Sequence, residues 1–233
     1  MQFFSIQKID WERIHIYFYK MPFVVSIEGN IGSGKSTIIN ALKTTDAIED
    51  IPVIYVDEPV KQWEDIKNKE GKNMIELFYE NPSRYSFAFQ MMAYISRLTL
   101  LKEAIERNPS CIIITERCLQ TDYNVFAKML YEQGVLLEEE YAIYTKWFDA
   151  FCKDSAISAI VYVYCDPEVS FERCKKRNRT GENIPLEYLG RCHQKHEEWI
   201  RGETIDTLII DNNTTELQDA LFSIHLFISD LVK

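Results

Sequence analysis

The sequence has no hydrophobic run long enough to cross a membrane and no surplus of basic residues. A transmembrane helix needs about 20 consecutive apolar residues, and no apolar stretch of the chain approaches that length. The 26 lysines and arginines are outnumbered by 36 aspartates and glutamates, which leaves a formal net charge of −10. Domains that bind nucleic acids normally carry a basic surplus. We therefore expect neither a membrane protein nor a protein that binds nucleic acid.

The six cysteines include no C-x-x-C pair and are scattered through apolar segments. This distribution is typical of reduced thiols rather than of a disulfide or zinc framework. His193 and His196 lie three residues apart on an expected helix, but no third ligand pattern lies near them. We expect a solvated helix face there rather than a metal site.

The first twenty residues lack the features of a targeting signal. Charged residues between Lys8 and Arg13 interrupt their apolar content, which disfavours a secretory signal peptide. Their acidic residues and their scarcity of Ser and Arg disfavour a transit peptide. We interpret residues 1–20 as an N-terminal extension of unknown role, and we expect a cytoplasmic protein, with a mitochondrial location left open.

Linkers, internal repeats and low-complexity tracts are also absent, so one domain is expected over residues 21–233. Apolar runs alternate with helical stretches, which predicts an α/β fold with a parallel sheet and crossover helices. Val- and Ile-rich runs, typical of strands buried on both faces, occupy residues 23–28, 53–57, 111–115, 157–164 and 207–210. Helices are expected at residues 37–43, 82–108, 167 onward, 185–201 and 215–231, the second with Asn81 as its cap.

The first expected strand runs into a glycine-rich motif of the form G-x-x-x-x-G-K-[ST]. Its residues are Gly29, Asn30, Ile31, Gly32, Ser33, Gly34, Lys35 and Ser36, and Thr37 follows. Glycines let backbone N–H groups surround phosphates, Lys35 can reach the β- and γ-oxygens, and Ser36 can offer its hydroxyl to Mg²⁺. Strand, motif and helix together disfavour a chance turn. The motif predicts a nucleotide site, but GTPases, motor ATPases and small-molecule kinases all use it.

Acidic residues follow two other expected strands. Ligands of an open parallel sheet sit beyond the carboxyl ends of its strands, so Glu58 should face the crevice that contains the motif. There it could accept a proton from an attacking hydroxyl, and Trp63 could wall an aromatic acceptor site. Glu116 could act on Mg²⁺, and Arg117 could neutralise phosphate charge. Taken alone, Glu58 could equally be a surface acid, and Glu116 with Arg117 a strand-end ion pair.

Six separated segments resemble the deoxynucleoside kinase family, in family order and at similar separations, from about residue 22 to residue 211. The segments are GNIGSGKST (29–37), EPVKQW (58–63), LFYENPSRYSFAFQ (77–90), SR (96–97), ERCLQTDYNVF (116–126) and IPLEYL (184–189). The resemblance implies a P-loop kinase fold, here with a five-stranded parallel sheet and an arginine-rich lid. It also implies transfer of a phosphoryl group from ATP, with Mg²⁺, to the 5′-hydroxyl of a deoxyribonucleoside.

The resemblance assigns roles to residues of the acceptor side. Glu58 would be the general base, assisted by Arg117, and the metal ligands would be Ser36 and Glu116. Gln90 would pair with the base, whose two faces would lie between Phe126 and Phe89, beside Trp63. Tyr79 and, with a weaker correspondence, Glu182 would bind the 3′-hydroxyl. The family's mobile lid would supply arginines to the ATP phosphates, here Arg173, Arg177 and Arg179.

Arg97 and Asp122 bear on the choice of nucleoside. Members of the family that prefer deoxycytidine and purine deoxynucleosides have an Arg and an Asp at these positions, whereas thymidine-accepting members have smaller or apolar residues. An Arg–Asp pair can hydrogen-bond an amino-bearing base edge and crowd the thymine methyl group. The resemblance therefore predicts deoxycytidine or a purine deoxynucleoside over thymidine, and a homodimer formed through two long helices.

Two alternatives stay open from the sequence. A nucleoside monophosphate kinase shares the P-loop, the lid and the general fold, but it needs cationic groups to hold the acceptor phosphate. A non-catalytic scaffold subunit on the same fold need not keep Lys35, Ser36, Glu58, Glu116 and Arg117, all of which are present.

Overall fold

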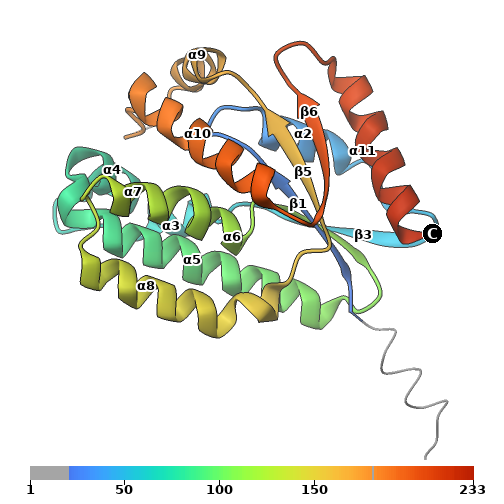
Figure 1. Ribbon diagram of the computed structural model, residues 1–233, viewed down its shortest axis with the longest axis horizontal. Coiled ribbons are helices and arrows are strands. Elements are labelled where there is room, and N and C mark those ends of the chain that lie inside the picture. The colour runs from blue at the N-terminus through green and yellow to red at the C-terminus, as the bar shows by residue number, and fades with distance from the viewer. Residues whose placement is uncertain (1–20, 180) are drawn as a thin grey trace, which may run out of the picture.

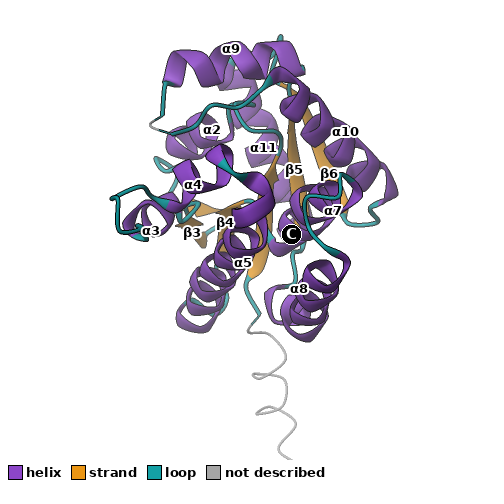
Figure 2. Cartoon of the chain, turned by 90° about the vertical axis from the view of Figure 1, so that its left-hand side faces the viewer, coloured by secondary structure: helices purple, strands orange, loops and turns teal. Residues whose placement is uncertain are grey.

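The computed structural model describes residues 21–179 and 181–233; the expected extension, residues 1–20, lies outside the described residues. A six-stranded sheet runs through the molecule and helices cover both of its faces (Figures 1 and 2). The strand order is β2-β3-β4-β1-β5-β6. The strands are β1 (Phe23–Glu28), β2 (Ala47–Ile48), β3 (Ile51–Val56), β4 (Ile112–Glu116), β5 (Ala159–Tyr164) and β6 (Asp206–Asp211).

The expected sheet of five parallel strands is wrong by one strand. The five expected strands are present and pair in parallel, but β2 adds a sixth that pairs antiparallel with β3. Glu49 and Asp50 join the two strands with φ angles of 49° and 60°. Two left-handed residues are typical of a tight hairpin, which the sequence usually marks with Asn-Gly or Asp-Gly. The pair Glu-Asp carries no such signal.

Strand β1 lies at the centre of the sheet, between β4 and β5, and its alternate side chains belong to two cores. Val25 and Ile27 pack with apolar residues of α2 (Lys35–Leu42) and α11 (Leu217–Val232). Val24 packs on the other face with Leu101 and Trp199, from α5 (Pro82–Arg107) and α10 (Leu186–Gly202). Strands β1, β4 and β5 are thus buried on both faces, as the sequence predicts. Strands β3 and β6 are only partly buried, which differs from that expectation, and Ile209 of β6 is 60% exposed.

Most of the remaining helices lie near α5, whereas α9 (Pro167–Arg177) lies beside α10 at the top of Figure 1, and together they carry much of the site. They are α3 (Val60–Asp65), α4 (Met74–Glu80), α6 (Leu119–Thr121), a π-helical turn η1 (Asp122–Ala127), α7 (Lys128–Glu132), α8 (Glu138–Phe151), the 3₁₀ turn η2 (Cys152–Ser155) and α9. The Asn81 side chain accepts from the Arg84 amide, which confirms the predicted cap of α5. None of the helices in the described part of the chain is long and apolar enough to cross a membrane.

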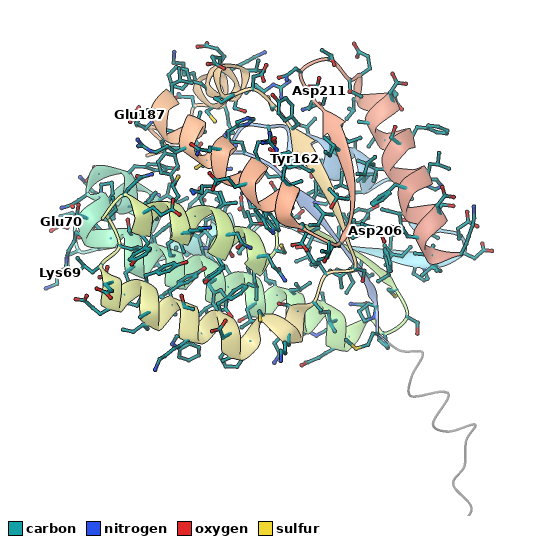
Figure 3. The ribbon with its side chains drawn as sticks, viewed as in Figure 1. Lys69, Glu70, Tyr162, Glu187, Asp206 and Asp211 are labelled. Carbon is teal, nitrogen blue, oxygen red and sulfur yellow. The ribbon has the colours of Figure 1, made fainter. Side chains whose placement is uncertain are left out.

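The histidine pair on α10 differs from the expected solvated face. His196 is fully buried, and its Nδ1 lies 2.7 Å from the Cys192 carbonyl oxygen. Its ring stacks on Tyr162 of β5, in the interior of the molecule. Figure 3 shows Tyr162 beside the neighbouring strand β6, whose two ends are Asp206 and Asp211. Burial lowers the pKa of His196 to about 3, so the imidazole is a neutral core residue. All six cysteines are free thiols.

Candidate active site

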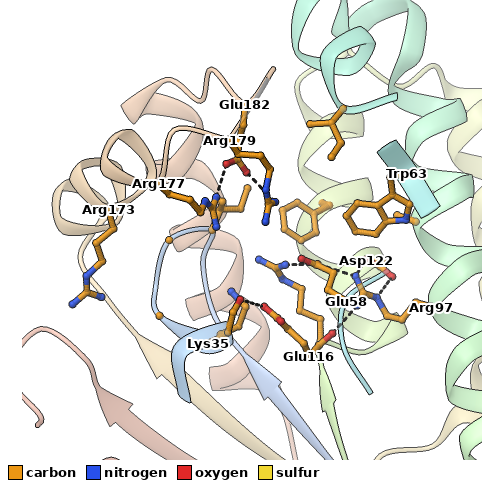
Figure 4. A pocket seen from close by; sticks show the side chains of 18 of the residues that line it. Lys35, Glu58, Trp63, Arg97, Glu116, Asp122, Arg173, Arg177, Arg179 and Glu182 are labelled. Atoms are coloured by element: carbon orange, nitrogen blue, oxygen red, sulfur yellow. Dashed lines mark hydrogen bonds and ion pairs between the residues drawn. The ribbon is translucent and has the colours of Figure 1, made fainter. Parts of the chain in front are cut away.

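A cavity of about 580 Å³ opens at the carboxyl ends of β1, β3 and β4 (Figure 4). This is where ligands of open parallel sheets bind. All of the predicted site residues line it except Gly29, Asn30 and Ser33. These three residues of the glycine-rich loop are buried, and the Asn30 side chain donates to the carbonyl oxygen of Leu189 on α10. The predicted residues are therefore brought together from segments that lie far apart in the sequence.

The glycine-rich loop is close-packed against its neighbours. A Cβ atom on Gly32, at φ 80°, would lie 2.5 Å from the Ser170 carbonyl oxygen, so only glycine fits. Gly34, at φ 101°, caps α2, whose first three residues line the cavity. Asn212 donates to the Ser33 carbonyl oxygen at 2.6 Å, and Arg173 donates to the same atom at 3.2 Å. The loop is therefore a shaped anion cradle at a helix N-terminus.

Lys35 is the cation of this cradle. Its side chain is almost fully buried and its Nζ donates to the Asn30 carbonyl oxygen at 2.7 Å. Burial, and then the charge of Arg117, lower the pKa of Lys35 to about 7, although Glu116 and Glu58 act in the opposite direction. A bound phosphate would restore the ammonium form by supplying negative charge.

Ser36 and Glu116 form the predicted metal position. The Ser36 hydroxyl donates to Glu116 Oε1 at 2.8 Å, which joins the start of α2 to the end of β4. No cluster of three or more His, Cys, Asp or Glu side chains that could hold a metal occurs in the described residues. One hydroxyl and one carboxylate nevertheless fit Mg²⁺, which usually keeps waters and takes its other ligands from phosphates.

Glu58 lies opposite Lys35 in the cavity, two residues after the end of β3. Its carboxylate accepts from Arg117 Nη1 at 2.5 Å and from Arg97 Nη2 at 3.2 Å. Burial raises the pKa of Glu58, but the charges of Arg117, Arg97 and Lys35 outweigh burial and hold it at about 2. Glu58 is therefore an ionised hydrogen-bond acceptor throughout the physiological pH range.

Arg97 and Asp122 form a buried ion pair beside Glu58. Arg97 Nε donates to Asp122 Oδ2 at 2.9 Å, and Nη1 donates to the Glu116 carbonyl oxygen at 2.7 Å. Asp122 opens the π-helical turn η1, a geometry that is frequent at functional sites. Burial raises the pKa of Asp122, and the adjacent Arg97 opposes this shift. Arg97 thus joins α5, β3, β4 and η1 through one guanidinium group.

Aromatic side chains wall the acceptor part of the cavity. Trp63 meets Phe89 edge-on with ring centroids 5.6 Å apart, and its Nε1 donates to Ser96. Phe89 also stacks on Phe78 at 4.7 Å. Phe126 also lines the cavity, with the Arg117 guanidinium 5.3 Å from its ring centroid. These walls suit a flat aromatic ligand.

Gln90 supplies the polar group of this apolar space. It is 2% exposed, and within the described part of the chain its Oε1 has no hydrogen-bond partner. A buried amide oxygen without a partner is costly, and native proteins rarely keep one unless a ligand or water uses it. Gln90 Oε1 is therefore a buried acceptor that the donor of a ligand or a water could use.

The expected lid residues divide into two groups. Arg173 lies within α9 and is committed to the Ser33 and Asn212 carbonyl oxygens. Arg177 and Arg179 lie nearer the centre of the cavity, where Glu182 pairs with Arg177 at 2.5 Å and with Arg179 at 3.6 Å (Figure 4). Glu182 also acts on the pKa of Tyr79, which burial raises well above its ordinary value. Thr180 of the expected lid lies outside the described residues.

Seven further residues of the cavity were not predicted: Ile38, Ile75, Phe78, Ala93, Tyr188, Asn212 and Leu217. Asn212 directly follows β6, so the strand-end argument that indicated Glu58 could have found it. Phe78 and Tyr188 lie inside two of the quoted segments, but their aromatic side chains are equally typical of packing. Without the position of the neighbouring rings, no sequence signal separates these two uses.

Comparison with known proteins agrees with this geometry. Residues 25–230 match the family model for deoxynucleoside kinase. Deoxycytidine kinase 1 of Xenopus laevis is 36% identical over 208 residues, which cover 78% of this chain and 76% of that protein. Human deoxycytidine kinase is 36% identical over 204 residues, 78% and 77% of the two chains. The mitochondrial deoxyguanosine kinase of Xenopus laevis is 31% identical over 201 residues, 78% and 74%.

The family model covers most of the chain, and these relatives exceed 30% identity over about three-quarters of both partners. The predicted α/β kinase fold is also present, with its P-loop between β1 and α2. The chain therefore belongs to the deoxynucleoside kinase family and is a nucleoside kinase.

Proposed function

We propose that the protein transfers the γ-phosphoryl group of ATP to the 5′-hydroxyl of a deoxyribonucleoside, with Mg²⁺, as a salvage enzyme. The observation that carries the proposal is that Lys35 and Glu58 face one cavity from opposite sides. A phosphate cradle lies on one side of it, and aromatic walls with an unpaired amide oxygen lie on the other. A nucleoside kinase needs both halves at bonding distance of one transferring group.

On the donor side, the loop amides and Lys35 would hold the phosphates, and Arg177 and Arg179 would close over them. Ser36 and Glu116 would hold Mg²⁺, which neutralises charge on the phosphate oxygens when it is bound. The lid arginines have to exchange Glu182 for phosphate, and a phosphate offers more charge and more acceptor oxygens than one carboxylate.

On the acceptor side, Glu58 would accept a hydrogen bond from the 5′-hydroxyl and take its proton. A carboxylate with a pKa of about 2 is a weak base. In a loose transition state the proton leaves late, so the first role of Glu58 is to orient the hydroxyl. Movement of Arg117 toward the transferring phosphoryl group would weaken its ion pair with Glu58 and raise the pKa of Glu58 when the proton must be accepted.

The base would lie between Phe126 and Phe89, with Gln90 pairing to its edge and the Arg97–Asp122 pair beside it. Asp122 presents carboxylate oxygens that can accept from an amino group, as deoxycytidine and purine bases offer. Thymine presents a carbonyl and a methyl group instead. We infer a preference for deoxycytidine or a purine deoxynucleoside over thymidine, supported by the buried Arg97–Asp122 geometry.

A direct test is phosphoryl transfer from Mg-ATP to deoxycytidine, deoxyadenosine, deoxyguanosine and thymidine, measured beside Glu58→Gln. The amide keeps the shape of Glu58 but cannot take the proton, so we expect kcat to fall by about 10²- to 10⁴-fold. The matched control is Glu64→Gln, an acidic-to-amide change on α3 that does not line the cavity. Full activity in Glu58→Gln would contradict the assigned base.

The same assay separates the alternatives. A monophosphate kinase would phosphorylate dCMP or dTMP and leave the free nucleosides unchanged. A scaffold subunit would bind ATP, measurable by calorimetry, without turnover on either class of acceptor. Either result would overturn the proposed acceptor site.

The exposed face of α5 and α8 supports the proposed homodimer. Ile95 on α5 and Ile143 and Trp147 on α8 are 48%, 45% and 44% exposed, and the two helices lie side by side (Figure 1). Clustered apolar side chains on one surface are typical of a protein–protein interface. We expect a dimer by sedimentation equilibrium and dissociation in Trp147→Glu, while Phe222→Glu, on the exposed face of α11, should leave the dimer intact.

A further inference from the structure

The last residue of β1, Glu28, is a fully buried carboxyl group that no step of the proposed reaction uses. Its Oε1 accepts from the Ser26 hydroxyl and its Oε2 from the Thr121 hydroxyl, each at 2.5 Å. Ser26 and Thr121 are also completely buried. Burying a carboxylate is costly unless it is well paired. A charge that is kept on neutral partners in this place calls for a reason beyond packing.

Glu28 lies at the junction of the two halves of the site. The next residue, Gly29, begins the phosphate loop, and Thr121 belongs to α6, between Arg117 and Asp122 in the chain. One carboxyl group therefore joins the strand that carries the donor loop to the segment that carries the acceptor residues.

The segment that Glu28 holds begins in a strained conformation. Arg117 has a φ of 64°, a left-handed value that is unfavourable for a side chain with a Cβ atom. Its backbone N–H donates to the Ile27 carbonyl oxygen at 3.1 Å, and its Nη2 donates to the Gly29 carbonyl oxygen at 3.3 Å. These bonds fix the near end of the turn against β1. The Glu28–Thr121 bond fixes the far end, four residues later.

Glu28 also helps to stabilise the buried positive charges of Arg97 and Arg117. Burial disfavours the charged forms of Arg97 and Arg117, and Glu28 is among the negative groups that offset this effect. Glu58, another of these groups, becomes neutral when it accepts the proton of the 5′-hydroxyl. Glu28 takes no part in the transfer, so its charge continues to face both guanidinium groups through that step.

We propose that Glu28 is a positioning residue for the transfer: its carboxylate, through the Thr121 hydroxyl, holds the turn that directs Arg117 at Glu58. The inference rests on the proposed function, because it concerns the geometry of that reaction. Loss of the link would move Arg117 and Glu58 relative to the donor loop without removing either group. Displacements of about 1 Å at reacting groups can lower rates by about 10²-fold.

The test compares Glu28→Gln, Thr121→Val, Thr121→Ser and the double variant Glu28→Gln/Thr121→Val by steady-state kinetics. Gln keeps the shape of Glu28 but loses the charge and one acceptor oxygen, and Val keeps the shape of Thr121 but loses the hydroxyl. We expect kcat to fall by about 10- to 100-fold in each, with KM for ATP within about threefold of wild type. Thr121→Ser should retain kcat, and the double variant should be no slower than Glu28→Gln, because both changes break one link.

Thermal unfolding of each variant, and a destabilised control, separate positioning from general stability. Ile224→Ala removes buried side-chain atoms on α11, at the opposite face of the sheet, and should lower Tm while leaving kcat unchanged. If Glu28→Gln does not fold, Thr121→Val and Thr121→Ser still test the link. Unchanged kcat in Thr121→Val, or equal losses in Thr121→Val and Thr121→Ser, would overturn the inference. An inactive wild-type protein would overturn the proposed function, whereas an active one with unaffected variants overturns the inference alone.

Discussion

The two halves of the cavity are built by different means. The donor half consists mainly of one continuous loop, Gly29 to Ser36, most of which lines the cavity and which contains a single cation, Lys35. The acceptor half consists of side chains from several separate elements, and its charged groups pair with one another. The single guanidinium group of Arg97 donates hydrogen bonds to Asp122, to Glu58 and to the Glu116 carbonyl oxygen.

This difference determines how each half should respond to substitution. In the donor half, loss of a side chain removes one interaction with phosphate and leaves the loop intact. In the acceptor half, loss of one charged partner leaves another charge buried and unpaired, which typically costs about 3–5 kcal/mol. Effects should therefore be local on the donor side and coupled on the acceptor side.

The largest effect is expected on the donor side, from Lys35→Met. The variant keeps the side chain's length but removes the only cation that lies within the loop, so charge on the transferring group loses its compensation. We expect kcat to fall by about 10³-fold. Thermal stability should be unchanged or higher, because the buried ammonium no longer has to be desolvated. Single-turnover kinetics and Tm measure the two quantities, and a large loss of Tm would contradict the local character of this half.

The next effect is a change of base selectivity on the acceptor side. Asp122→Ala alone would leave Arg97 partly unpaired and should destabilise the fold, whereas Arg97→Met/Asp122→Ala removes both charges and opens space beside the base. We expect the double variant to raise kcat/KM for thymidine relative to deoxycytidine by about 10- to 100-fold. Urea unfolding of both single variants and the double variant measures the coupling. Additive stability losses would show that the two charges do not act as a pair.

The same contrast explains how much of the molecule the sequence predicts. The donor loop could be predicted residue by residue, because a backbone cradle requires glycine at fixed spacings and one lysine at its end. The five parallel strands were also predicted, since short Val- and Ile-rich runs that alternate with helical stretches are typical of a parallel sheet. Hairpin strand β2 was missed because Glu49 and Asp50 adopt positive φ without the usual residues.

In the acceptor half, Glu58, Trp63 and Arg117 were indicated by their places after expected strands, and the other residues could be predicted only through resemblance to a family. Gln90 lies on α5 among apolar residues, and nothing in its sequence context shows that Oε1 is left without a partner. Glu28 was assigned to a strand and given no role, because its partner Thr121 is 93 residues away in the chain. His196 was expected at a solvated face, since many of its neighbours in the sequence are charged. The ring on which it stacks, Tyr162, lies in a separate strand, β5. Contacts between distant segments decide each of these cases.

The smallest expected effect is a difference in pH dependence between the donor half and the acceptor half. The pKa of Lys35 is lowered to about 7, whereas that of Glu58 is held at about 2. Between pH 7 and 9 the donor half therefore changes charge and Glu58 on the acceptor side does not. Bound phosphate favours the ammonium form of Lys35, so binding of Mg-ATP above pH 7 takes up a proton. Its affinity should fall by up to about tenfold per pH unit as pH rises above 7, and Lys35 should contribute no pH dependence well below 7.

Calorimetry of Mg-ATP binding at pH 6.5, 7.5 and 8.5, in buffers of different ionisation enthalpy, measures both affinity and proton uptake. Lys35→Met is the matched control, because titration of the nucleotide itself remains while that of Lys35 is removed. Nucleoside affinity, measured by the same method, should be flat across this range, since Glu58 stays ionised throughout it. Equal pH dependence in wild type and Lys35→Met would show that Lys35 is already fully charged in the free protein. The two halves would then differ in how they are built but not in how they titrate.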